Sequence, residues 1–487
     1  MNKTTLLWLR HDFRLAENPA LDAAVKRGGT VLPVFIWSPN EESLWQPGGA
    51  SRWWLHRSLR ELDLRVREIG SRLTIRRGPA LESLKALAKQ TGADAVLWNR
   101  RYEPAVIARD ATVKEALRAD GLEVESFNAA LLHEPWTIQN QSRKPFQVFT
   151  PFWRHCLAKP DPGEPLPAPE SLPGPSKWPQ SLALDELKLE PEFNWTGGLN
   201  SAWQPGESGA TANLHRFLDS AFDDYSEKRN RPDATGTSRL SPHLHFGEIS
   251  PRQVWHGLSR MAVKRGLPVG KWRDSQFLAE LGWREFAHHL LYHFPHTPTE
   301  PLRAGFNKLP WRMNPVHMRA WQKGLTGFPI VDAGMRELWA TGWMHNRVRM
   351  IVASFLVKDL LIPWQEGARW FWDTLVDADL AQNTLGWQWT AGCGADAAPY
   401  YRVFNPTSQG ERFDPNGDYV RKWCPELSRL PAKWIHQPEN APPVVLIAAG
   451  VEPGRNYPRP IVNHSLARQE ALEAFARIKS AGADDRG

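Results

Sequence analysis

The stretch KPDPGEPLPAPESLPGPSKWP, residues 159–179, separates two parts of the chain that differ in character. Proline lacks a backbone donor and fixes φ, so a segment this rich in proline cannot sustain a helix. We expect it to run in an extended form over the surface as a connector. The sequence therefore predicts an N-terminal domain at residues 1–132, an extended linker at 133–205 and a C-terminal domain at 206–487.

The N-terminal part alternates between apolar, β-rich runs and amphipathic segments. The runs are TLLWLR, TVLPVFIW, SRLTIRRG, AVLWNR and LEVESFNA, and helical patterns lie at about 49–69 and between the later runs. This alternation predicts a Rossmann-like α/β domain, with a parallel sheet and helices on both faces. No GxGxxG follows the first run, so the usual dinucleotide-binding fingerprint is missing. Beyond residue 206, helix-period patterns predict an all-α domain that ends in a charged helix near 464–480.

The composition narrows the class of protein. The chain has 487 residues, 41% of them hydrophobic, and a net charge of +7, which favours a polyanionic partner. We expect a cytoplasmic monomer without membrane contact, because the sequence contains neither a secretory signal nor about eighteen consecutive apolar residues. The scattered Cys156, Cys393 and Cys424 are interpreted as structural thiols. The 25 tryptophans are unusual, since indoles fill cores but also stack on nucleobases and flavins.

Several enzyme classes lack their motifs in this sequence. The histidine-rich HHLLYHFPH, residues 288–296, has no HExxH pattern and no neighbouring acidic or cysteine ligands, so we predict no metal site. A Walker A sequence is absent, which argues against a P-loop ATPase. The GxSxG nucleophile elbow is absent as well.

Two motifs suit binding but also have plain structural interpretations. In TGTSRLSPHLHFGEIS, residues 235–250, Thr237, Ser238 and Ser241 surround Arg239 ahead of a helical pattern. Such hydroxyl and NH groups could hold a phosphate, or they could simply cap a helix. In FLAELGWREF, residues 277–286, helical spacing places Glu280, Trp283 and Arg284 on one face, where they could contact a nucleobase and its phosphate or form an internal ion pair beside a core indole.

A third motif is basic. WMHNRVRM, residues 343–350, brings Asn346, Arg347 and Met350 together on a helix, while Arg349 faces another side. If this surface is buried, its arginines need anionic partners such as Asp377, because an unpaired buried charge is very costly. A solvated basic helix is the alternative. The flanking stretches WATGWM and IVASFL are more apolar than a solvated helix would be.

The stretch DADLAQNTLGWQWTAG, residues 377–392, combines two carboxylates, an amide and two indoles. With the motifs above it resembles the photolyase and cryptochrome family, and the similarity covers nearly the whole chain. The motifs occur in that family's order: WLRHDFRLAENPAL, TSRLSPHLHFGEIS, WREF, GFPIVDAGMREL, WMHNRVRM, DADLAQNTLGWQW and FNPTSQGERFDP. The resemblance implies an α/β antenna domain followed by a helical domain that buries a U-shaped FAD.

The resemblance also implies roles for residues around the flavin. Asp377 would pair with Arg349, and Asn383 would lie beside the flavin N5, where an amide favours the reduced anion and a carboxylate would oppose it. Plant cryptochromes tend to carry Asp at that position, so Asn383 favours repair over signalling. The remaining cofactor-binding positions implied by the family are Tyr225, Thr237, Ser238, Arg239, Leu240, Ser241 and Asp379.

The implied substrate is a cyclobutane pyrimidine dimer in damaged DNA, because Asn346 stands where (6-4) enzymes carry the second residue of a His-His pair. Blue light would excite reduced FAD, which would lend an electron to the flipped-out dimer and recover it after the ring splits. Glu280 and Asn346 would bind the dimer, Trp283, Trp389 and Met350 would border it, and Arg229, Arg284, Arg347, Arg402 and Gln409 would contact DNA. By the same resemblance, Trp387, Trp364 and Trp311 would relay electrons from the surface to oxidised flavin.

The sequence departs from the family at the position where several members bind an antenna pigment. Several bacterial homologues hold folate through an Asn-Glu pair, and the corresponding residues here are Ala105 and Val106. We expect an antenna chromophore in the N-terminal domain, with 5,10-methenyltetrahydrofolate as the candidate. Two alternatives to a photolyase stay open: a cryptochrome-type blue-light photoreceptor without repair activity, and a light-independent DNA-binding protein that keeps the fold.

Overall fold

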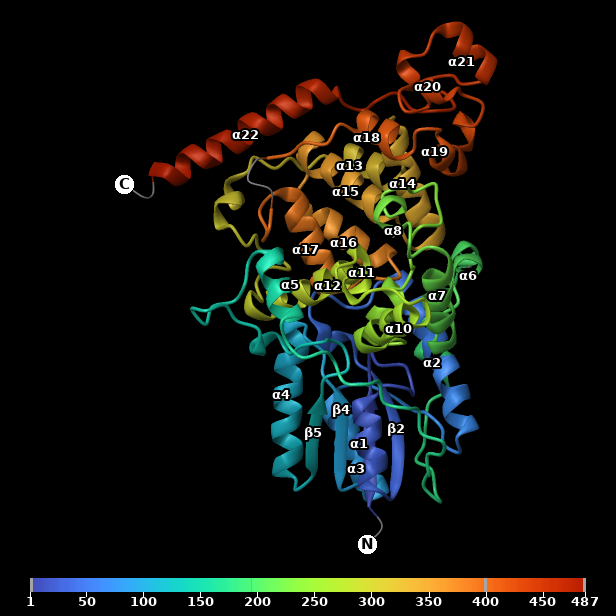
Figure 1. Ribbon diagram of the computed structural model, residues 1–487, viewed down its shortest axis with the longest axis vertical. Coiled ribbons are helices and arrows are strands. Elements are labelled where there is room, and N and C mark those ends of the chain that lie inside the picture. Colours follow the sequence, from blue (N-terminus) through green and yellow to red (C-terminus); the bar gives the residue numbers. More distant parts are fainter. Residues whose placement is uncertain (1–2, 194, 398–400, 485–487) are drawn as a thin grey trace. The chain divides into compact units, whose positions relative to one another are not determined.

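The computed structural model describes residues 3–193, 195–397 and 401–484 (Figure 1). The chain divides into two compact units. Unit 1 consists of Met1–Ser220, Ser238–Pro295 and Val376–Leu380, and unit 2 of Ala221–Thr237, His296–Leu375 and Ala381–Gly487. Because the units alternate along the chain, they do not coincide with the expected division at residues 132 and 205, which stays a proposal about sequence segments.

Unit 1 contains a five-stranded parallel sheet, as the alternating sequence predicted. Its strands are β1 (Thr4–Leu9), β2 (Thr30–Trp37), β3 (Thr74–Arg77), β4 (Ala95–Asn99) and β5 (Glu123–Phe127). The order is β3-β2-β1-β4-β5, with β1 in the middle, Leu7 opposite Pro33 of β2 and Trp8 opposite Trp98 of β4. The chain therefore reverses its direction of winding beside β1, which is the arrangement of doubly wound α/β folds.

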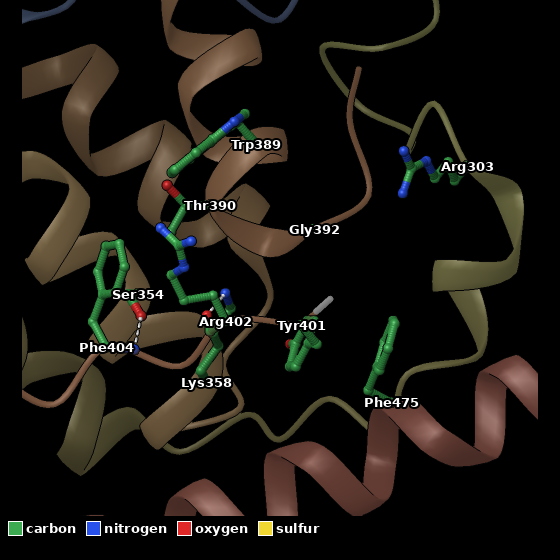
Figure 2. A pocket seen from close by; sticks show the side chains of 10 residues that line it. All are labelled: Arg303, Ser354, Lys358, Trp389, Thr390, Gly392, Tyr401, Arg402, Phe404 and Phe475. Atoms are coloured by element: carbon green, nitrogen blue, oxygen red, sulfur yellow. Dashed lines mark hydrogen bonds between the residues drawn. The ribbon is translucent and has the colours of Figure 1, made fainter. Parts of the chain in front are cut away.

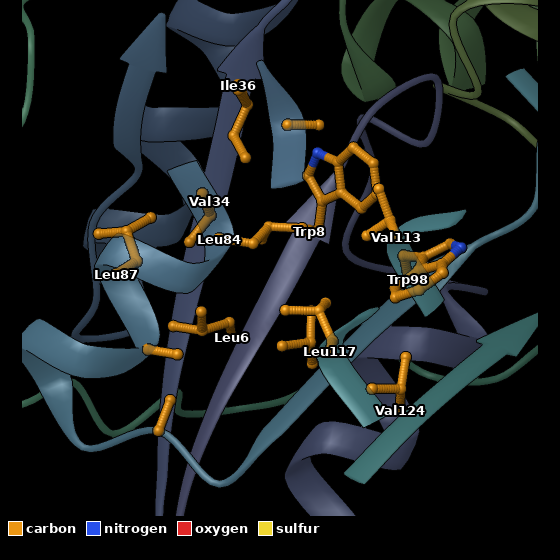
Figure 3. Close-up of a cluster of buried hydrophobic side chains, with 14 of the residues drawn as sticks. Leu6, Trp8, Val34, Ile36, Leu84, Leu87, Trp98, Val113, Leu117 and Val124 are labelled. Atoms are coloured by element: carbon orange, nitrogen blue, oxygen red, sulfur yellow. The ribbon is translucent and has the colours of Figure 1, made fainter. Parts of the chain in front are cut away.

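Alternate side chains of the strands build the core on one face of this sheet (Figure 3). Leu6 and Trp8 of β1, with Val34 and Ile36 of β2, pack in one cluster with apolar residues of two helices. The helices are α3 (Ala80–Thr91), with Leu84 and Leu87, and α4 (Pro104–Ala119), with Val113 and Leu117. The period of two along each strand, set by the pleat, decides which residues enter this core.

The helix α1 (Pro19–Arg27) packs on β1 and β4 and was not predicted. Asn18 caps it by accepting a hydrogen bond from the Leu21 amide at 3.1 Å, Pro19 occupies its first turn, and Gly28 ends it at φ 75°. These are ordinary start and stop signals of a helix. The predicted helix at about 49–69 is confirmed as α2 (Gly49–Glu68).

Residues 159–179 contain no helix or strand, in agreement with the proline-rich sequence. They are nevertheless tied to unit 1 by backbone hydrogen bonds: Val31 donates to the Pro173 carbonyl at 3.0 Å, and Leu172 donates to the Ile69 carbonyl at 2.8 Å. The wider linker was not expected to hold helices, yet it includes α5 (Phe149–Leu157) and α6 (Gly197–Ala202) and the short turns η2 (Pro135–Thr137) and η3 (Leu184–Leu187).

The rest of the described chain is helical, which confirms the all-α prediction. Ser275 caps α12 by accepting from the Leu278 amide, and Ser250 and Gln253 form a capping box at the start of α10. None of the helices in the described residues has the length and apolar character needed to cross a bilayer. In unit 1 the later helices are α7 (Glu207–Ser220), α9 (Ser241–His245), α10 (Pro251–Lys264), α11 (Val269–Arg273) and α12 (Gln276–His293).

The helices of unit 2 begin with α8 (Tyr225–Lys228), α13 (Pro315–Lys323), α14 (Pro329–Thr341), α15 (Asn346–Ser354), the π turn η5 (Phe355–Asp359) and α16 (Trp364–Thr374). They continue with α17 (Leu380–Ala391), α18 (Pro406–Phe413), α19 (Asp418–Trp423), α20 (Ala432–Ile435), α21 (Pro443–Ala449) and α22 (His464–Asp484). Short 3-10 turns are η1 (Pro39–Glu42), η4 (Ala304–Lys308), η6 (Pro425–Leu427) and η7 (Pro438–Asn440). The expected helix near 464–480 is α22.

Candidate functional site

The start of α15 presents the residues expected at the lesion. His345 caps the helix, its Nδ1 accepting from the Arg347 amide at 3.2 Å. Burial, followed by the charges of Arg347 and Arg349, lowers the pKa of His345 to about 3, so the ring stays neutral and keeps accepting. Asn346 is exposed in the first turn and Met350 is half-buried one turn on. The cap thus fixes the helix start without depending on physiological pH.

Arg347 lies in a cluster of positive charge within unit 2. Its Nη2 donates to Asn230 Oδ1 at 2.7 Å, and its guanidinium lies 4.5 Å from the Phe413 ring centroid. Burial lowers the pKa of Arg347, and the charges of three neighbouring arginines lower it further. We call the four residues the arginine cluster: Arg229, Arg347, Arg402 and Arg412. Like charges held together in this way favour an anionic ligand.

The arginine cluster contains three of the residues predicted to contact DNA and one that was missed. Arg412 lies on α18, three residues after the predicted Gln409 and within the motif FNPTSQGERFDP. Asn230, which orients Arg347, was also missed. Asn230 lies in no motif, and the motif around Arg412 does not distinguish that residue, because what distinguishes both is proximity to Arg347 in the folded unit.

On α12 the three residues of the WREF region have different environments. Glu280 is half-buried and accepts from Gln276 Nε2 at 2.8 Å. The half-buried Trp283 stacks one face on Phe149, with ring centroids 3.8 Å apart and planes 10° apart. Arg284 is only 9% exposed and donates to the carbonyls of Ala130 at 2.6 Å and Leu244 at 3.4 Å. This burial does not support the DNA contact that we expected for Arg284.

Two carboxylates expected near the flavin belong to the short Val376–Leu380 segment of unit 1. Asp379 Oδ2 lies 3.5 Å from both His245 Nδ1 and His288 Nε2. Burial alone would raise the pKa of Asp379, but His288, His245 and Arg284 hold it well below its usual range, so the group stays ionised. Asp377 is buried. Its predicted partner Arg349 belongs to unit 2, where Nε donates to the Met344 carbonyl at 2.7 Å, and their pairing stays a prediction.

The loop expected to hold the pyrophosphate is a tight turn in which Arg239 adopts a left-handed φ of 55°. Ser238 Oγ accepts from the Leu240 amide at 3.4 Å, and the Arg239 guanidinium lies 4.1 Å from the Trp203 ring centroid. Leu240 is buried and stands at the N-cap of α9, directly before Ser241. A local turn is therefore present, but the N-cap residue of α9 is Leu240, which makes no side-chain cap hydrogen bond, so the Ser/Thr cap expected in the alternative interpretation is not seen. A phosphate-holding role for the turn stays a prediction.

Thr237 and Tyr225 belong to the Ala221–Thr237 part of unit 2. Tyr225 is buried, and the guanidinium of Arg229 lies 5.7 Å from its ring centroid. A side chain at Gly236 would approach the Lys228 carbonyl oxygen to 2.7 Å, so this segment requires glycine just before Thr237.

Helix α17 carries the amide and indoles of the DADLAQNTLGWQW motif. Asn383 Nδ2 donates to the Ala368 carbonyl at 3.0 Å, which leaves Oδ1 as an acceptor. Trp387 is 2% exposed, and its Nε1 has no hydrogen-bond partner among the described residues. Because residues four apart share a helix face, α17 offers an acceptor and a donor on the same face. This combination fits a bound heteroaromatic cofactor. The half-buried Trp389 is turned to another partner, donating to the Asp396 carbonyl at 3.1 Å.

The tryptophans proposed as a relay range from buried to partly exposed. Trp387 and Trp364 are each 2% exposed, whereas Trp311 is intermediate. The ring of Trp387 contacts Phe371, with centroids 5.0 Å apart, and lies against Gly367, where a Cβ would come within 2.0 Å of the indole. An exposed end is what a route to the surface needs, but electron transfer through these residues stays a prediction.

His289 and the cysteines are buried in the protein interior. The three cysteines are buried and unbonded to one another, and burial raises the pKa of Cys393 to about 12. His289 Nε2 accepts from the Phe146 amide at 3.0 Å, and burial lowers its pKa to about 3. Within the described part of the chain, no group of three or more His, Cys, Asp or Glu side chains is arranged to hold a metal ion.

Comparison with known proteins decides the family. A model described as the FAD binding domain of DNA photolyase matches residues 277–477, and one described as DNA photolyase matches residues 5–170. A deoxyribodipyrimidine photo-lyase from Agrobacterium fabrum is 49% identical over 478 residues, covering 97% of this chain and 98% of that protein. This chain belongs to the photolyase/cryptochrome family.

Other members of the family are similar over the same length. Cryptochrome-1 of Arabidopsis thaliana is 42% identical over 97% of this chain and 70% of its own length. The crystal structure of a bacterial class III photolyase from Agrobacterium tumefaciens superposes with a TM-score of 0.94 at 48% identity, covering 99% of this chain and 98% of that one. The photolyase fold is thereby established, with an FAD-binding domain on the helical part of the chain. Proteins named deoxyribodipyrimidine photo-lyase and proteins named cryptochrome are both among its relatives.

Proposed function

We propose that this chain repairs cyclobutane pyrimidine dimers in DNA under blue light, as a deoxyribodipyrimidine photo-lyase. The observation that carries the proposal is the arginine cluster beside Asn346. Four guanidinium groups within one unit would bind the phosphates that flank a lesion, and such contacts fix the register of a protein on DNA. The exposed amide of Asn346 would then contact the edges of the flipped-out dimer.

The bound cofactor would be FAD, which supplies the electron that opens the cyclobutane ring when it is reduced and excited by light. The chain's own contribution would be to orient that cofactor and keep its environment fixed. Asn383 would offer Oδ1 as an acceptor because its Nδ2 is held by Ala368, and Asp379 would stay ionised beside His245 and His288. The turn Thr237–Ser241, with Tyr225, Arg349 and Asp377, would complete the binding site.

Around the dimer, Glu280 would donate or accept a hydrogen bond, and Trp283, Trp389 and Met350 would pack against it. Trp283 has one face covered by Phe149, so only its other face or its edge would be available. Arg229, Arg347, Arg402 and Gln409 would contact the DNA backbone. We leave Arg284 out of this set, since its guanidinium is engaged by two carbonyls. Trp387, Trp364 and Trp311 would restore reduced flavin.

A dimer-containing oligonucleotide tests the proposal directly. The protein with reduced FAD should restore the thymines under blue light and leave them dimerised in darkness, and Glu280→Ala should slow repair while FAD stays bound. Light-independent DNA binding without repair would contradict the proposal. So would a light-induced flavin change without repair, which would favour a photoreceptor. The photoreceptor alternative has its own support, since Cryptochrome-1 of Arabidopsis thaliana is 42% identical to this chain.

An antenna chromophore in the N-terminal domain belongs to the same proposal, with 5,10-methenyltetrahydrofolate as the pigment. Val106 is buried in the first turn of α4, so it would not reach a folate from the position where other bacterial homologues use a polar side chain. An absorption spectrum of the purified protein, before and after release of its cofactors by heat, would show a near-ultraviolet band beyond that of flavin. Flavin bands alone would contradict the folate assignment.

A further inference from the structure

Unit 2 contains a pocket that shares Trp389 and Arg402 with the proposed DNA-binding site and has further lining residues with no role in that proposal (Figure 2). It encloses about 520 Å³, including space open to solvent, and is lined from η5, the end of α17, the residues around 402 and α22. Three cationic side chains line it, those of Arg303, Lys358 and Arg402. Among the described lining residues none is Asp or Glu, so the pocket is strongly positive.

Tyr401 is packed into the wall of this pocket. Its ring stacks on Phe475 of α22, with centroids 4.6 Å apart and planes 7° apart, and the Lys358 ammonium lies 4.6 Å from the ring centroid. The residue is only 7% exposed, and its hydroxyl has no hydrogen-bond partner among the described residues. A buried hydroxyl without a partner is costly, so an acceptor placed within hydrogen-bond distance of it would be stabilising.

Lys358 has hydrogen-bonding capacity left over. It is 5% exposed and donates one hydrogen bond to the Arg402 carbonyl, whereas an ammonium group carries three donors. Burial lowers the pKa of Lys358 to about 7. The charge of Arg402 also lowers this pKa, whereas the charge of Asp359 raises it. Asp359 is itself engaged by His464 Nδ1 at 2.5 Å. The positive charge of Lys358 is therefore only partly compensated inside the unit.

We infer that this pocket binds a phosphate group, held by the Tyr401 hydroxyl, the Lys358 ammonium and the guanidinium groups of Arg303 and Arg402. Every polar group named here donates, and the cations match a tetrahedral oxyanion of one or two negative charges. The phosphate has two possible sources, the backbone of bound DNA or free inorganic phosphate. The DNA source rests on the proposed function, because Arg402 also belongs to the arginine cluster; the free source does not.

Inorganic phosphate is the first probe, added in the dark to the full chain with its flavin. We expect calorimetry to show binding at about 10 mM or below. Tyr401→Phe keeps the ring stack and removes only the hydroxyl, and it should weaken binding about five- to tenfold. Lys358→Met should weaken it further. The matched control is Lys323→Met, an exposed lysine at the end of α13, which should bind phosphate like the unaltered chain.

A lesion-free single-stranded oligonucleotide, again in the dark, identifies the source. If the pocket takes a backbone phosphate, Lys358→Met should make the slope of log K against log salt less negative by about 0.7, and inorganic phosphate should compete with DNA. If the pocket takes free phosphate, Lys358→Met should abolish the binding of inorganic phosphate but leave the slope of log K against log salt for DNA unchanged.

The inference is overturned if the unaltered chain does not bind phosphate and both variants keep the DNA salt slope. It is equally overturned if Tyr401→Phe and Lys358→Met bind phosphate as tightly as Lys323→Met does. Far-ultraviolet circular dichroism and thermal midpoints verify that the variants fold. All readouts are taken in darkness, so failure of light-driven repair would leave this result intact.

Discussion

Helices α12 and α15 each carry an arginine from a motif of the family, Arg284 and Arg347, but the two arginines have different surroundings. In α12, Arg284 is buried and donates to the carbonyls of Ala130 and Leu244. In α15, Arg347 is half-buried beside three like charges, with the neutral Asn230 as its hydrogen-bond partner. The difference shows that the balance of partners around an arginine, and not its sequence motif, separates a structural cation from one poised for a ligand.

The strongest test removes the buried cation. Arg284→Met should lower the free energy of unfolding by about 3 kcal/mol, because two buried carbonyls lose their donor and Asp379 loses a nearby positive charge. Urea unfolding measures this loss. The matched Arg347→Met should cost less than about 1 kcal/mol, since it relieves repulsion within the arginine cluster. Equal losses in the two variants would contradict the distinction between the helices.

A second effect should appear in the pH dependence of the free energy of unfolding, through Glu285 of unit 1. Burial raises the pKa of Glu285 on α12 to about 7, while Arg284 and the Leu132 and His133 amides pull it down. The raised value means that its contribution to stability is present below pH 4.5 and is lost as pH rises to about 7. The slope is about 1.4 kcal/mol per pH unit in that window.

Glu285→Gln checks this contribution, because glutamine still accepts from the two amides but does not ionise. The difference in unfolding free energy between the two proteins should change across pH 4.5 to 7 and be constant outside this window. A difference that does not vary with pH would show that Glu285 titrates in the folded protein as it does in the unfolded chain.

The comparison of Arg284 with Arg347 also predicts a smaller effect, on the affinity for DNA. Arg347→Met should lower affinity for an oligonucleotide about tenfold at low salt and make the slope of log K against log salt less negative by about 0.9 for duplex DNA. Fluorescence anisotropy over a salt series measures both. Arg455→Met is the control, because that side chain is 82% exposed and pairs with Glu452. The same loss in the control would show that any surface arginine of unit 2 contributes equally.

The smallest expected effect concerns the residue that orients Arg347. Asn230→Ala removes the 2.7 Å hydrogen bond and should reduce DNA affinity about two- to threefold, since the guanidinium is less well ordered. Asn230→Asp should reduce it more, because a carboxylate would neutralise Arg347. Tighter DNA binding by the aspartate variant than by the alanine variant would mean that Arg347 does not face DNA.

Much of the architecture was predictable, because it depends on local patterns. The five apolar, β-rich runs predicted the five strands of the described sheet, and helix periodicity predicted the all-α part. The helix α1 was not predicted, although Asn18 and Pro19 are ordinary start signals of a helix. The helix α5 was harder to expect, since it lies inside a linker whose prolines dominate the neighbouring sequence.

The sequence predicted the candidate functional site less completely than the fold. Arg284 and Arg347 both belong to family motifs, but their burial and partners come from residues more than a hundred positions away, such as Ala130 and Asn230. The same holds for Lys358 and Tyr401, which have no motif of their own. Their significance arises from an unsatisfied hydroxyl and a partly compensated charge, which only the packed unit reveals.

The proline-rich connector at 159–179 has a practical consequence through the backbone hydrogen bonds that tie it to Ile69 and Val31. A protease needs an extended segment that can leave the surface and enter its cleft, and these bonds hold this one down. Limited digestion should therefore spare the connector despite its length and lack of helix. A chain nicked by design between Leu166 and Leu172 should keep its two fragments associated, because the Leu166 carbonyl accepts from the Glu17 amide on one side of the cut and Leu172 donates to Ile69 on the other.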